Sequence, residues 1–364
     1  DAHHDLQSLH AGLAGGVDDL GDGAERRGRS DLEPELPREI TEPDALLERR
    51  VERLDQVPLR AAHPLLGGDA PMGVERHERV DVVGIGVVAG NVPLHSAVQN
   101  ALYTREVCGR GDVPVHVGAD RPLVLPLGTA QNVHGHDGMG DIGLELRGRE
   151  PDAGHAVDAL IEASHRHAGE LTLVTLGPLT NIALAVRRDP TIVERIPRVV
   201  IMGAAADHVG NVNPVAEFNM WVDPHAVQVV LDSGLPLEFV GWDISRRDAV
   251  IVPSLANELR AIGTPLAEFC IDIQATVASF CATETKLAGF DLPDPIAMAY
   301  AIDPKIATET RRMHLEVECD STTTRGMVVM DLLGFTRREE NALVVMHADH
   351  ERFVEMLREM MTRS

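Results

Sequence analysis

The sequence predicts an α/β fold, a single large domain in which helices flank a mostly parallel central sheet. From residue 80 onward, short apolar runs alternate with longer runs of helical character. The apolar runs are hydrophobic at almost every position, as is typical of parallel strands covered on both faces. In such sheets a ligand binds beyond the carboxyl ends of the strands, so polar residues at those ends are the candidates for a site.

Residues 1–79 differ in composition from the rest of the chain, because they contain no Phe, Tyr, Trp, Lys or Cys. Charged, Gly-rich segments of this kind bury little apolar surface to offset the entropy lost on ordering. We therefore expect two parts: residues 1–79, an atypical segment that is disordered or not native, and residues 80–364, the α/β domain. A reading-frame error, a mis-assigned start or a rearrangement would produce such a segment.

The predicted elements follow one another through the domain. Strands are expected at 80–88, 114–118, 171–176, 198–203 and 237–242, with helices between them at 95–109, 153–169, 179–189 and 223–234. Later runs predict one long helix over 266–283, a C-terminal helix over 347–362, and edge strands at 314–319 and 342–346.

Charge and cysteine content exclude several classes of partner. The net charge of −24 argues against nucleic acid and against an anionic membrane surface. The four cysteines have no metal-binding spacing, which is typical of reduced thiols. We find no apolar run of about 18 residues, as a membrane span requires, and no hydrophobic signal core at the start of the chain. We expect a cytoplasmic protein with no nucleic-acid or membrane partner.

The strongest motif is GNVNPVAEFNMWVDP, over residues 210–224. It places Asn211, Glu217 and Asn219 on one short connection after the strand that ends near Met202. Amides and a carboxylate held at a strand end suit a small ligand rich in hydroxyl groups. Taken alone, Glu217 would be an ordinary surface carboxylate.

This motif closely resembles the nucleoside hydrolases of the inosine–uridine preferring type, and the resemblance extends over residues 80–360. It implies a nucleoside-hydrolase-like domain with a Rossmann-like core that acts in purine or pyrimidine salvage. Asn211, Glu217 and Asn219 would bind the ribose hydroxyls, and Met202 would lie near the sugar. The family is commonly dimeric or tetrameric, so a homodimer or homotetramer is implied.

Three other positions gain a role from the resemblance. Asn91 ends the segment VVGIGVVAGN; on sequence alone it would be a turn residue, whereas in the family it contacts the nucleoside. The main-chain carbonyl of Leu176 and the carboxylate of Asp294 match ligands of a bound calcium ion. Many members carry a His before that Asp as proton donor to the departing base, but here the residue is Pro293, which cannot donate.

The segment VHGHDGMGDIGL, over residues 133–144, has three interpretations. Its string of His134, His136 and Asp137 could suggest a metal. The family match instead suggests a loop beside the pocket, with His134 aligned to the family's His-Gly. Either histidine could also simply be solvated.

The family's first motif, Asp-Thr-Asp-x-Gly-x-Asp-Asp, is absent. It supplies most calcium ligands and the base that activates water, and only Asp69 is acidic near the expected place. The catalytic residue is therefore unknown, and we expect weak calcium binding and impaired hydrolysis of ribonucleosides to base and ribose. The alternative is a non-catalytic nucleoside- or ribose-binding protein. A generic Rossmann-like protein is a third possibility, but no GxGxxG follows a predicted strand.

Overall fold

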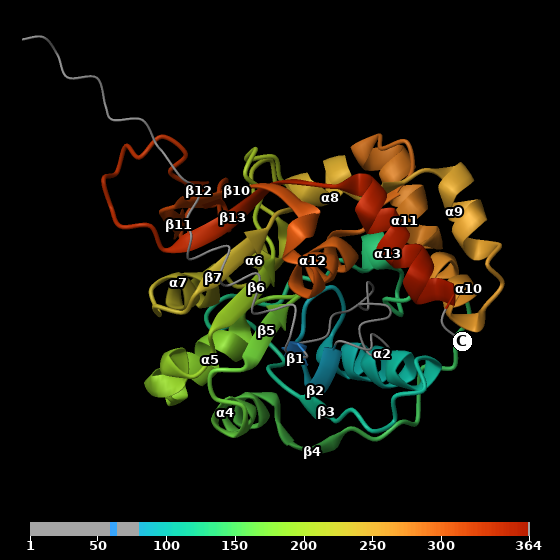
Figure 1. The fold of residues 1–364 in the computed structure, drawn as a ribbon, viewed down its shortest axis with the longest axis horizontal. Coiled ribbons are helices and arrows are strands. Elements are labelled where there is room, and N and C mark those ends of the chain that lie inside the picture. Colours follow the sequence, from blue (N-terminus) through green and yellow to red (C-terminus); the bar gives the residue numbers. More distant parts are fainter. Residues whose placement is uncertain (1–58, 64–79, 363–364) are drawn as a thin grey trace, which may run out of the picture. The chain divides into compact units, whose positions relative to one another are not determined.

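The computed structural model describes residues 59–63 and 80–362 of the chain. Its centre is a nine-stranded sheet (Figure 1) with the spatial order β10 (Ala307–Met313), β13 (Ala342–Ala348), β7 (Leu237–Val240), β6 (Arg198–Met202), β5 (Leu171–Thr175), β1 (Leu59–His63), β2 (Val80–Val87), β3 (Val115–Val117) and β4 (Asp152–His155). Neighbouring strands are parallel except β10 and β13. The predicted fold class is confirmed.

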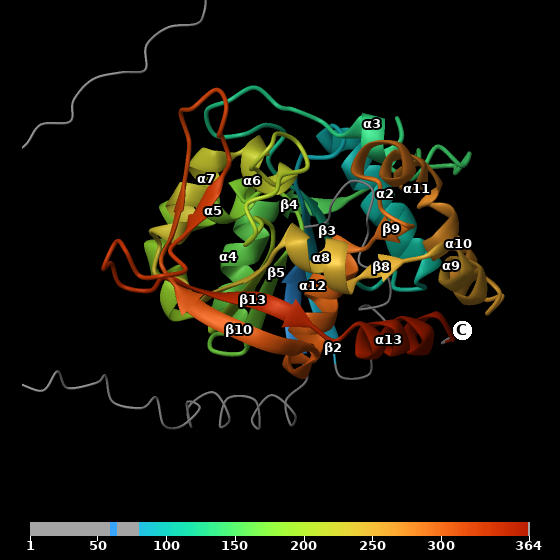
Figure 2. The same cartoon turned by 90° about the horizontal axis from the view of Figure 1, so that it is seen from above.

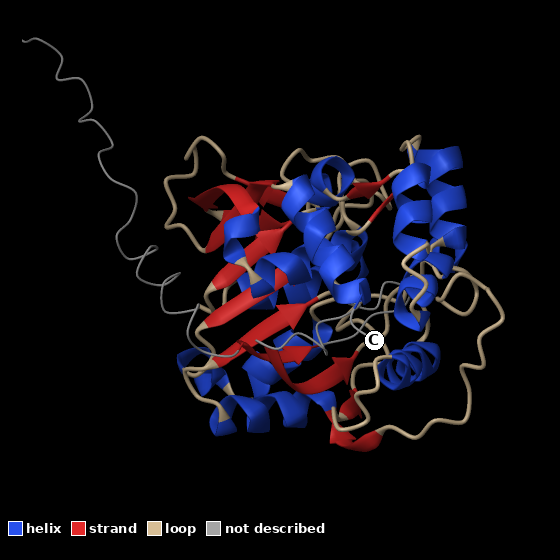
Figure 3. Ribbon diagram, turned by 45° about the vertical axis from the view of Figure 1, so that its right-hand side comes forward, coloured by secondary structure: helices blue, strands red, loops and turns tan. Residues whose placement is uncertain are grey.

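Helices cover both faces of this sheet, as Figures 2 and 3 show. One face carries α4 (Ala156–Arg166), α5 (Thr180–Arg188) and α7 (Pro224–Leu231). The other carries α2 (Leu94–Val107), α8 (Trp242–Asp248), α9 (Pro253–Arg260), α10 (Pro265–Asp272), α12 (Pro293–Ile302) and α13 (His350–Thr362). Adjacent strand residues face opposite layers: Leu173 packs with the first group and Val174 with the second.

Smaller elements lie around this framework. Two short strand pairs stand outside the central sheet, β8 (Val250–Ile251) with β9 (Phe290–Asp291), and β11 (Leu315–Val317) with β12 (Val328–Met330). The short helices are α3 (Gln131–His134), α6 (Phe218–Val222) and α11 (Ala275–Phe280), and single 3₁₀ turns occupy Pro190–Glu194 and Pro304–Ile306.

Two predictions for the C-terminal half need correction. The run at 342–346 is not an edge strand, because β13 lies between β10 and β7. The true edge, β10, has the polar sequence ATETRRM, and most of its residues are partly or fully exposed. Such a strand lacks the apolar signal that identifies a buried one. The predicted helix over 266–283 is helical but divides into α10, α11 and a π-helical turn at Cys281–Thr285.

The helical segment Pro265–Thr285 is, among the described residues, the one stretch long and apolar enough to cross a membrane. Buried core helices of globular domains can have the same length and apolar composition. Here Leu266, Phe269 and Cys270 are buried in the domain core, which accounts for the apolar composition of α10. The absence of a membrane partner stays a prediction.

The strand β1 lies within the segment that the sequence analysis separates from the domain. It pairs in parallel with both β2 and β5. Its short sequence LRAAH has no long apolar run and was not recognisable as a strand. Asp69 lies outside the described residues, and so does most of the segment before residue 80, so the two-part division stays a prediction.

The strand order fixes where a ligand would bind. From β1 the chain continues to β2, β3 and β4 on one side, and it then crosses to β5 on the other side. The order therefore reverses at β1. Parallel sheets bind ligands beyond the carboxyl ends of the strands at such a reversal.

Candidate functional site

A cavity of about 220 Å³ lies beyond the carboxyl ends of the central strands. It is lined by all seven residues that the sequence singles out: Asn91, Leu176, Met202, Asn211, Glu217, Asn219 and Asp294. They come from the segments that follow β2, β5 and β6 and from the start of α12. The structure thus brings together residues that are far apart in the sequence, while their individual roles stay predictions.

Glu217 is buried at the start of α6 and caps that helix. Its Oε1 accepts a hydrogen bond from the Asn219 N–H at 2.9 Å, and its Oε2 accepts from the N–H groups of Met220 at 3.2 Å and Ala204 at 3.3 Å. A carboxylate at a helix N-terminus satisfies amides that have no partner within the helix. The same side chain therefore ties both ends of the loop over residues 203–217, named here the β6–α6 loop, to the helix.

Burial raises the pKa of Glu217 to about 7, although the three backbone N–H groups act in the opposite direction. Only 3% of the residue is exposed, and no cation among the described residues contributes to the shift. Each carboxylate oxygen has two lone pairs. The ionised Glu217 can therefore still accept one further hydrogen bond, at Oε1, from a ligand hydroxyl in the cavity.

Asn219 spans the ends of two neighbouring strands. Its Nδ2 donates to the main-chain oxygens of Leu176 at 3.3 Å and Met202 at 3.4 Å, and to the Met202 Sδ at 3.3 Å. These long, shared contacts are individually weak, but they set the side-chain direction. The amide is held against the ends of β5 and β6, on the cavity wall.

Asn211 is exposed where it lines the cavity, and hydrogen bonds close the turn beside it. The Asn211 N–H donates to the Ala216 carbonyl at 3.1 Å. The Asn213 Oδ1 accepts from the N–H groups of Val215 at 3.0 Å and Ala216 at 2.8 Å. Asn213 thus shapes the turn that carries Asn211.

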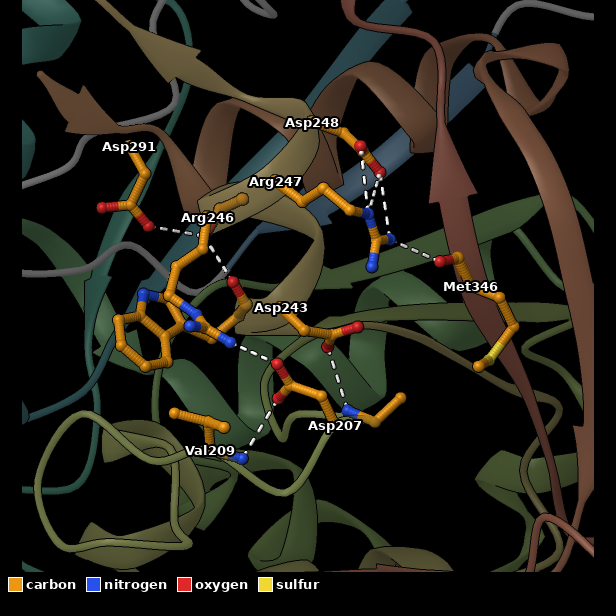
Figure 4. A network of polar contacts seen from close by, with 11 residues as sticks. Asp207, Val209, Asp243, Arg246, Arg247, Asp248, Asp291 and Met346 are labelled. Carbon is orange, nitrogen blue, oxygen red and sulfur yellow. Dashed lines mark hydrogen bonds and ion pairs between the residues drawn. The ribbon is translucent and has the colours of Figure 1, made fainter. Parts of the chain in front are cut away.

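Helix α8 holds the first half of the β6–α6 loop (Figure 4). The Arg246 guanidinium pairs with the Asp207 carboxylate and lies 4.5 Å from the centre of the Trp242 ring. One residue before Asp207, the Ala206 N–H donates to the Asp243 Oδ1 at 2.9 Å. These contacts connect the loop to Trp242, which lines the cavity.

A second part of the cavity wall was not identified from the sequence. It contains Trp242, Val277 and Phe280, with Cys281, Thr285 and Asp291 nearby in the lining. Trp242 follows the carboxyl end of β7. Because ligands bind beyond the carboxyl ends of parallel strands, its place in the site could have been predicted. Val277 and Phe280 lie on α11, and no sequence pattern indicated that this helix reaches the strand ends.

Asp291 places a further carboxyl group on this wall. The Ser245 hydroxyl donates to its Oδ2 at 2.6 Å, and the Cys281 Sγ lies 3.9 Å from its Oδ1. Pro293, two residues later, also lines the cavity. At the position where many family members carry a His as proton donor, this wall has Pro293, and the buried carboxyl group of Asp291 lies two residues earlier in the sequence.

The donor set does not complete a calcium site within the described residues. Asp294 and the Leu176 carbonyl both belong to segments lining the cavity, but calcium takes six to eight oxygen ligands. No group of three or more His, Cys, Asp or Glu side chains suited to a metal occurs in residues 80–362.

The His134–Asp137 string does not form a metal group in that range either. His134 ends α3 and lines the cavity, as a loop beside the pocket would place it, whereas His136 is exposed. The Asp137 Oδ1 accepts from the Met139 N–H at 2.7 Å and the Asp141 N–H at 3.1 Å. Asp137 orders the backbone of its own loop.

Comparison with known proteins matches residues 70–355 to the family model described as inosine-uridine preferring nucleoside hydrolase. The enzyme of that name from Leishmania major is 36% identical over 254 residues, which cover 69% of this chain and 80% of the relative. The pyrimidine-specific ribonucleoside hydrolase RihB of Escherichia coli O9:H4 is 34% identical over 286 residues, covering 78% and 90%.

Solved structures show the same likeness. A plant nucleoside hydrolase, PpNRh1, aligns with a TM-score of 0.79 and 28% identity over 84% of this chain and all of the other. A purine-preferring ribonucleoside hydrolase from Gardnerella vaginalis aligns with a TM-score of 0.74 and 26% identity, covering 83% and 98%. These relatives include both a pyrimidine-specific and a purine-preferring hydrolase.

Proposed function

Because the chain belongs to the inosine-uridine preferring nucleoside hydrolase family, we propose that it hydrolyses the N-glycosidic bond of ribonucleosides and releases base and ribose. The observation that carries this proposal is the convergence of Asn211, Glu217 and Asn219 on one cavity with Asn91 and Asp294. Side chains of this kind can form several hydrogen bonds to one sugar, which fixes its orientation.

We assign the ribose to the part of the cavity formed by the β6–α6 loop and α6. Glu217 accepts a hydrogen bond from a hydroxyl group, and the amides of Asn211 and Asn219 can both donate and accept. Cleavage of a glycosidic bond passes through a transition state in which the sugar carries positive charge. An ionised Glu217, held by backbone amides before the ligand arrives, stabilises that charge without reorganising.

The base then faces the wall of Trp242, Val277 and Phe280. Aromatic and aliphatic side chains suit the faces of a planar heterocycle. Pro293 cannot donate a proton to the leaving base, so we expect slower turnover than in relatives with a His there. This wall does not by itself distinguish purines from pyrimidines.

The direct test is the release of reducing sugar from inosine and from uridine by purified protein, with and without added calcium. Hydrolysis of either nucleoside above the buffer rate supports the proposal. We further propose a calcium requirement, a cytoplasmic location and a homodimeric or homotetrameric state. Full activity in excess EDTA would contradict the calcium requirement.

The second candidate is a non-catalytic protein that binds nucleosides or ribose. It is favoured by the absent Asp-rich motif and by the small number of predicted calcium ligands among the described residues. Calorimetry with inosine separates the two functions. Binding without sugar release supports the second candidate, and neither binding nor release would contradict both.

A further inference from the structure

The hairpin formed by β11 and β12 contacts the helix that carries the ribose-binding residues. Gly326, just before β12, has a φ of +80°, and an added Cβ would lie 2.7 Å from the Trp221 N and closer still to its Cα. Trp221 belongs to α6, the helix of Glu217 and Asn219. The two backbones therefore meet directly, and only glycine fits at this position without displacement.

The residue before it contacts both α6 and the β6–α6 loop. The Arg325 guanidinium lies 3.8 Å from the centre of the Trp221 ring. The Arg325 carbonyl accepts a hydrogen bond from the Asn213 Nδ2 at 2.9 Å. Asn213 is the residue that shapes the turn beside Asn211. One dipeptide thus holds the two segments that supply Asn211, Glu217 and Asn219.

Arg325 has no ion-pair partner among the described residues, and its Nε is buried without a hydrogen-bond acceptor. Burial lowers the pKa of its guanidinium. In a chain with a net charge of −24, an arginine could easily have a carboxylate neighbour. Its contact with the face of Trp221 is instead the interaction that orients it, because the ring face attracts a cation.

We propose that Arg325 and Gly326 are positioning residues for ribose recognition. They hold α6 and the turn at Asn213 so that the side chains of Asn211, Glu217 and Asn219 keep their mutual arrangement at the cavity. Neither residue lines the cavity itself. The proposal rests on the proposed function, since the sugar is the ligand that this arrangement would bind.

The test uses the full chain with Gly326→Ala and Arg325→Leu, and Gly334→Ala as a matched control. Gly334 also has a left-handed φ of +69°, but nothing lies within 4 Å of an added Cβ. The control therefore reproduces the backbone strain without the contact to α6. Arg325→Lys keeps the cation over the ring and is the conservative variant.

Hydrogen exchange provides a readout that needs no enzymatic activity. In Gly326→Ala and Arg325→Leu, we expect peptides covering residues 203–222 to exchange at least tenfold faster than in the wild type, and peptides covering β5 to remain unchanged. Gly334→Ala should exchange like the wild type in both regions, and Arg325→Lys should lie within threefold of it. Unchanged exchange at 203–222 in folded Arg325→Leu would overturn the proposal.

A second readout measures how strongly the site recognises the 3′-hydroxyl of the ribose. The preference for inosine over 3′-deoxyinosine, as a ratio of kcat/KM or of Kd, should fall about tenfold in Gly326→Ala and Arg325→Leu, with no change in Gly334→Ala. If the wild type neither binds nor cleaves inosine, the proposed function fails, and the exchange result still decides the positioning role. An unchanged preference in both test variants would contradict it.

Discussion

Two regions at opposite ends of β6 bury a charged group, and they satisfy it differently. At the amino end, Arg198 pairs with Glu238 on β7, and its Nη1 donates to the Ala301 carbonyl at 2.8 Å. Burial acts to lower the pKa of Arg198, but the charge and hydrogen bond of Glu238, together with Tyr300, raise it above its ordinary value. Beyond the carboxyl end, the donors to Glu217 in the described part of the chain are all backbone amides.

The difference separates a structural charge from a functional one. Arg198 is fully partnered within the fold, because its charge and its hydrogen bonds are satisfied by residues of two other elements, β7 and α12. Glu217 has donors but no opposite charge among the described residues, and burial therefore raises its pKa. A buried charge left in this state is typical of a site whose remaining partner is a ligand.

The largest effect is expected from Arg198→Ala. Removing one partner of a buried ion pair leaves Glu238 uncompensated, which costs about 3–5 kcal/mol of unfolding free energy. KM for nucleosides should remain within about twofold of the wild type in the folded fraction. Urea unfolding provides the measurement. Arg338→Ala, which removes an exposed pair with Glu316, is the control and should lose no more than about 1 kcal/mol.

Glu217→Gln should show the opposite pattern. Losing a preorganised group that stabilises transition-state charge costs about 10²–10³ in rate, so kcat/KM should fall by that factor while the protein remains folded. Steady-state kinetics with inosine and uridine provide the measurement, and Glu268→Gln, at the exposed start of α10, is the matched control. Wild-type kinetics in Glu217→Gln would remove the assigned role.

The raised pKa predicts how stability depends on pH. The folded protein keeps the Glu217 proton up to about pH 7, whereas the unfolded chain releases it near the ordinary glutamate pKa of 4.5. The unfolding free energy should therefore fall as pH rises from 4.5 to 7, by about 3 kcal/mol at roughly 1.4 kcal/mol per pKa unit. Glu217→Gln lacks this contribution, so the difference between the two proteins at pH 5 and pH 8 isolates it.

Binding should depend on pH in the reverse sense. Above about pH 7 the ionised Glu217 accepts a hydrogen bond from the sugar, and below it the neutral acid is a poorer acceptor. KM for inosine should therefore rise as pH falls through 7, although stability increases over the same range. A flat pH profile that Glu217→Gln leaves unchanged would show that this carboxyl does not bind the substrate.

The smallest effect is expected at the aromatic wall. Trp242→Leu removes a ring that would stack on the base, a contribution of about 0.5–1.5 kcal/mol. KM for inosine should rise up to about tenfold, whereas inhibition by free ribose should not change. Competition assays with ribose and with the free base measure the two separately. Equal losses for ribose and nucleoside would place the ring beside the sugar instead.

The sequence located the sugar side of the site because that side follows simple rules. Asn211, Glu217 and Asn219 lie on one connection after an apolar strand, and Leu176 directly follows another. The strand ends of a parallel sheet meet at one edge, so their convergence could be predicted. The sequences AEFN and DP within the same motif indicated the nucleoside hydrolase family, and the comparisons confirmed it.

The wall of Val277, Phe280 and Asp291 could not be predicted in the same way. These residues lie on α11 and β9, and their approach to the strand ends depends on how the segment after α10 breaks and turns. Tertiary packing determines that turn, and local periodicity does not reveal it. The edge strand β10 was missed for a related reason, since solvent exposure removes the apolar pattern.

The hydrogen bonds of Glu217 have a practical consequence for engineering. Because one side chain bonds to Ala204 and also caps α6, the ends of the β6–α6 loop are fastened together at its base. The entropy of closing such a loop grows only slowly with its length. A short peptide tag inserted beside the exposed Val209 should therefore be tolerated, and it would provide a reporter on the loop that carries Asn211.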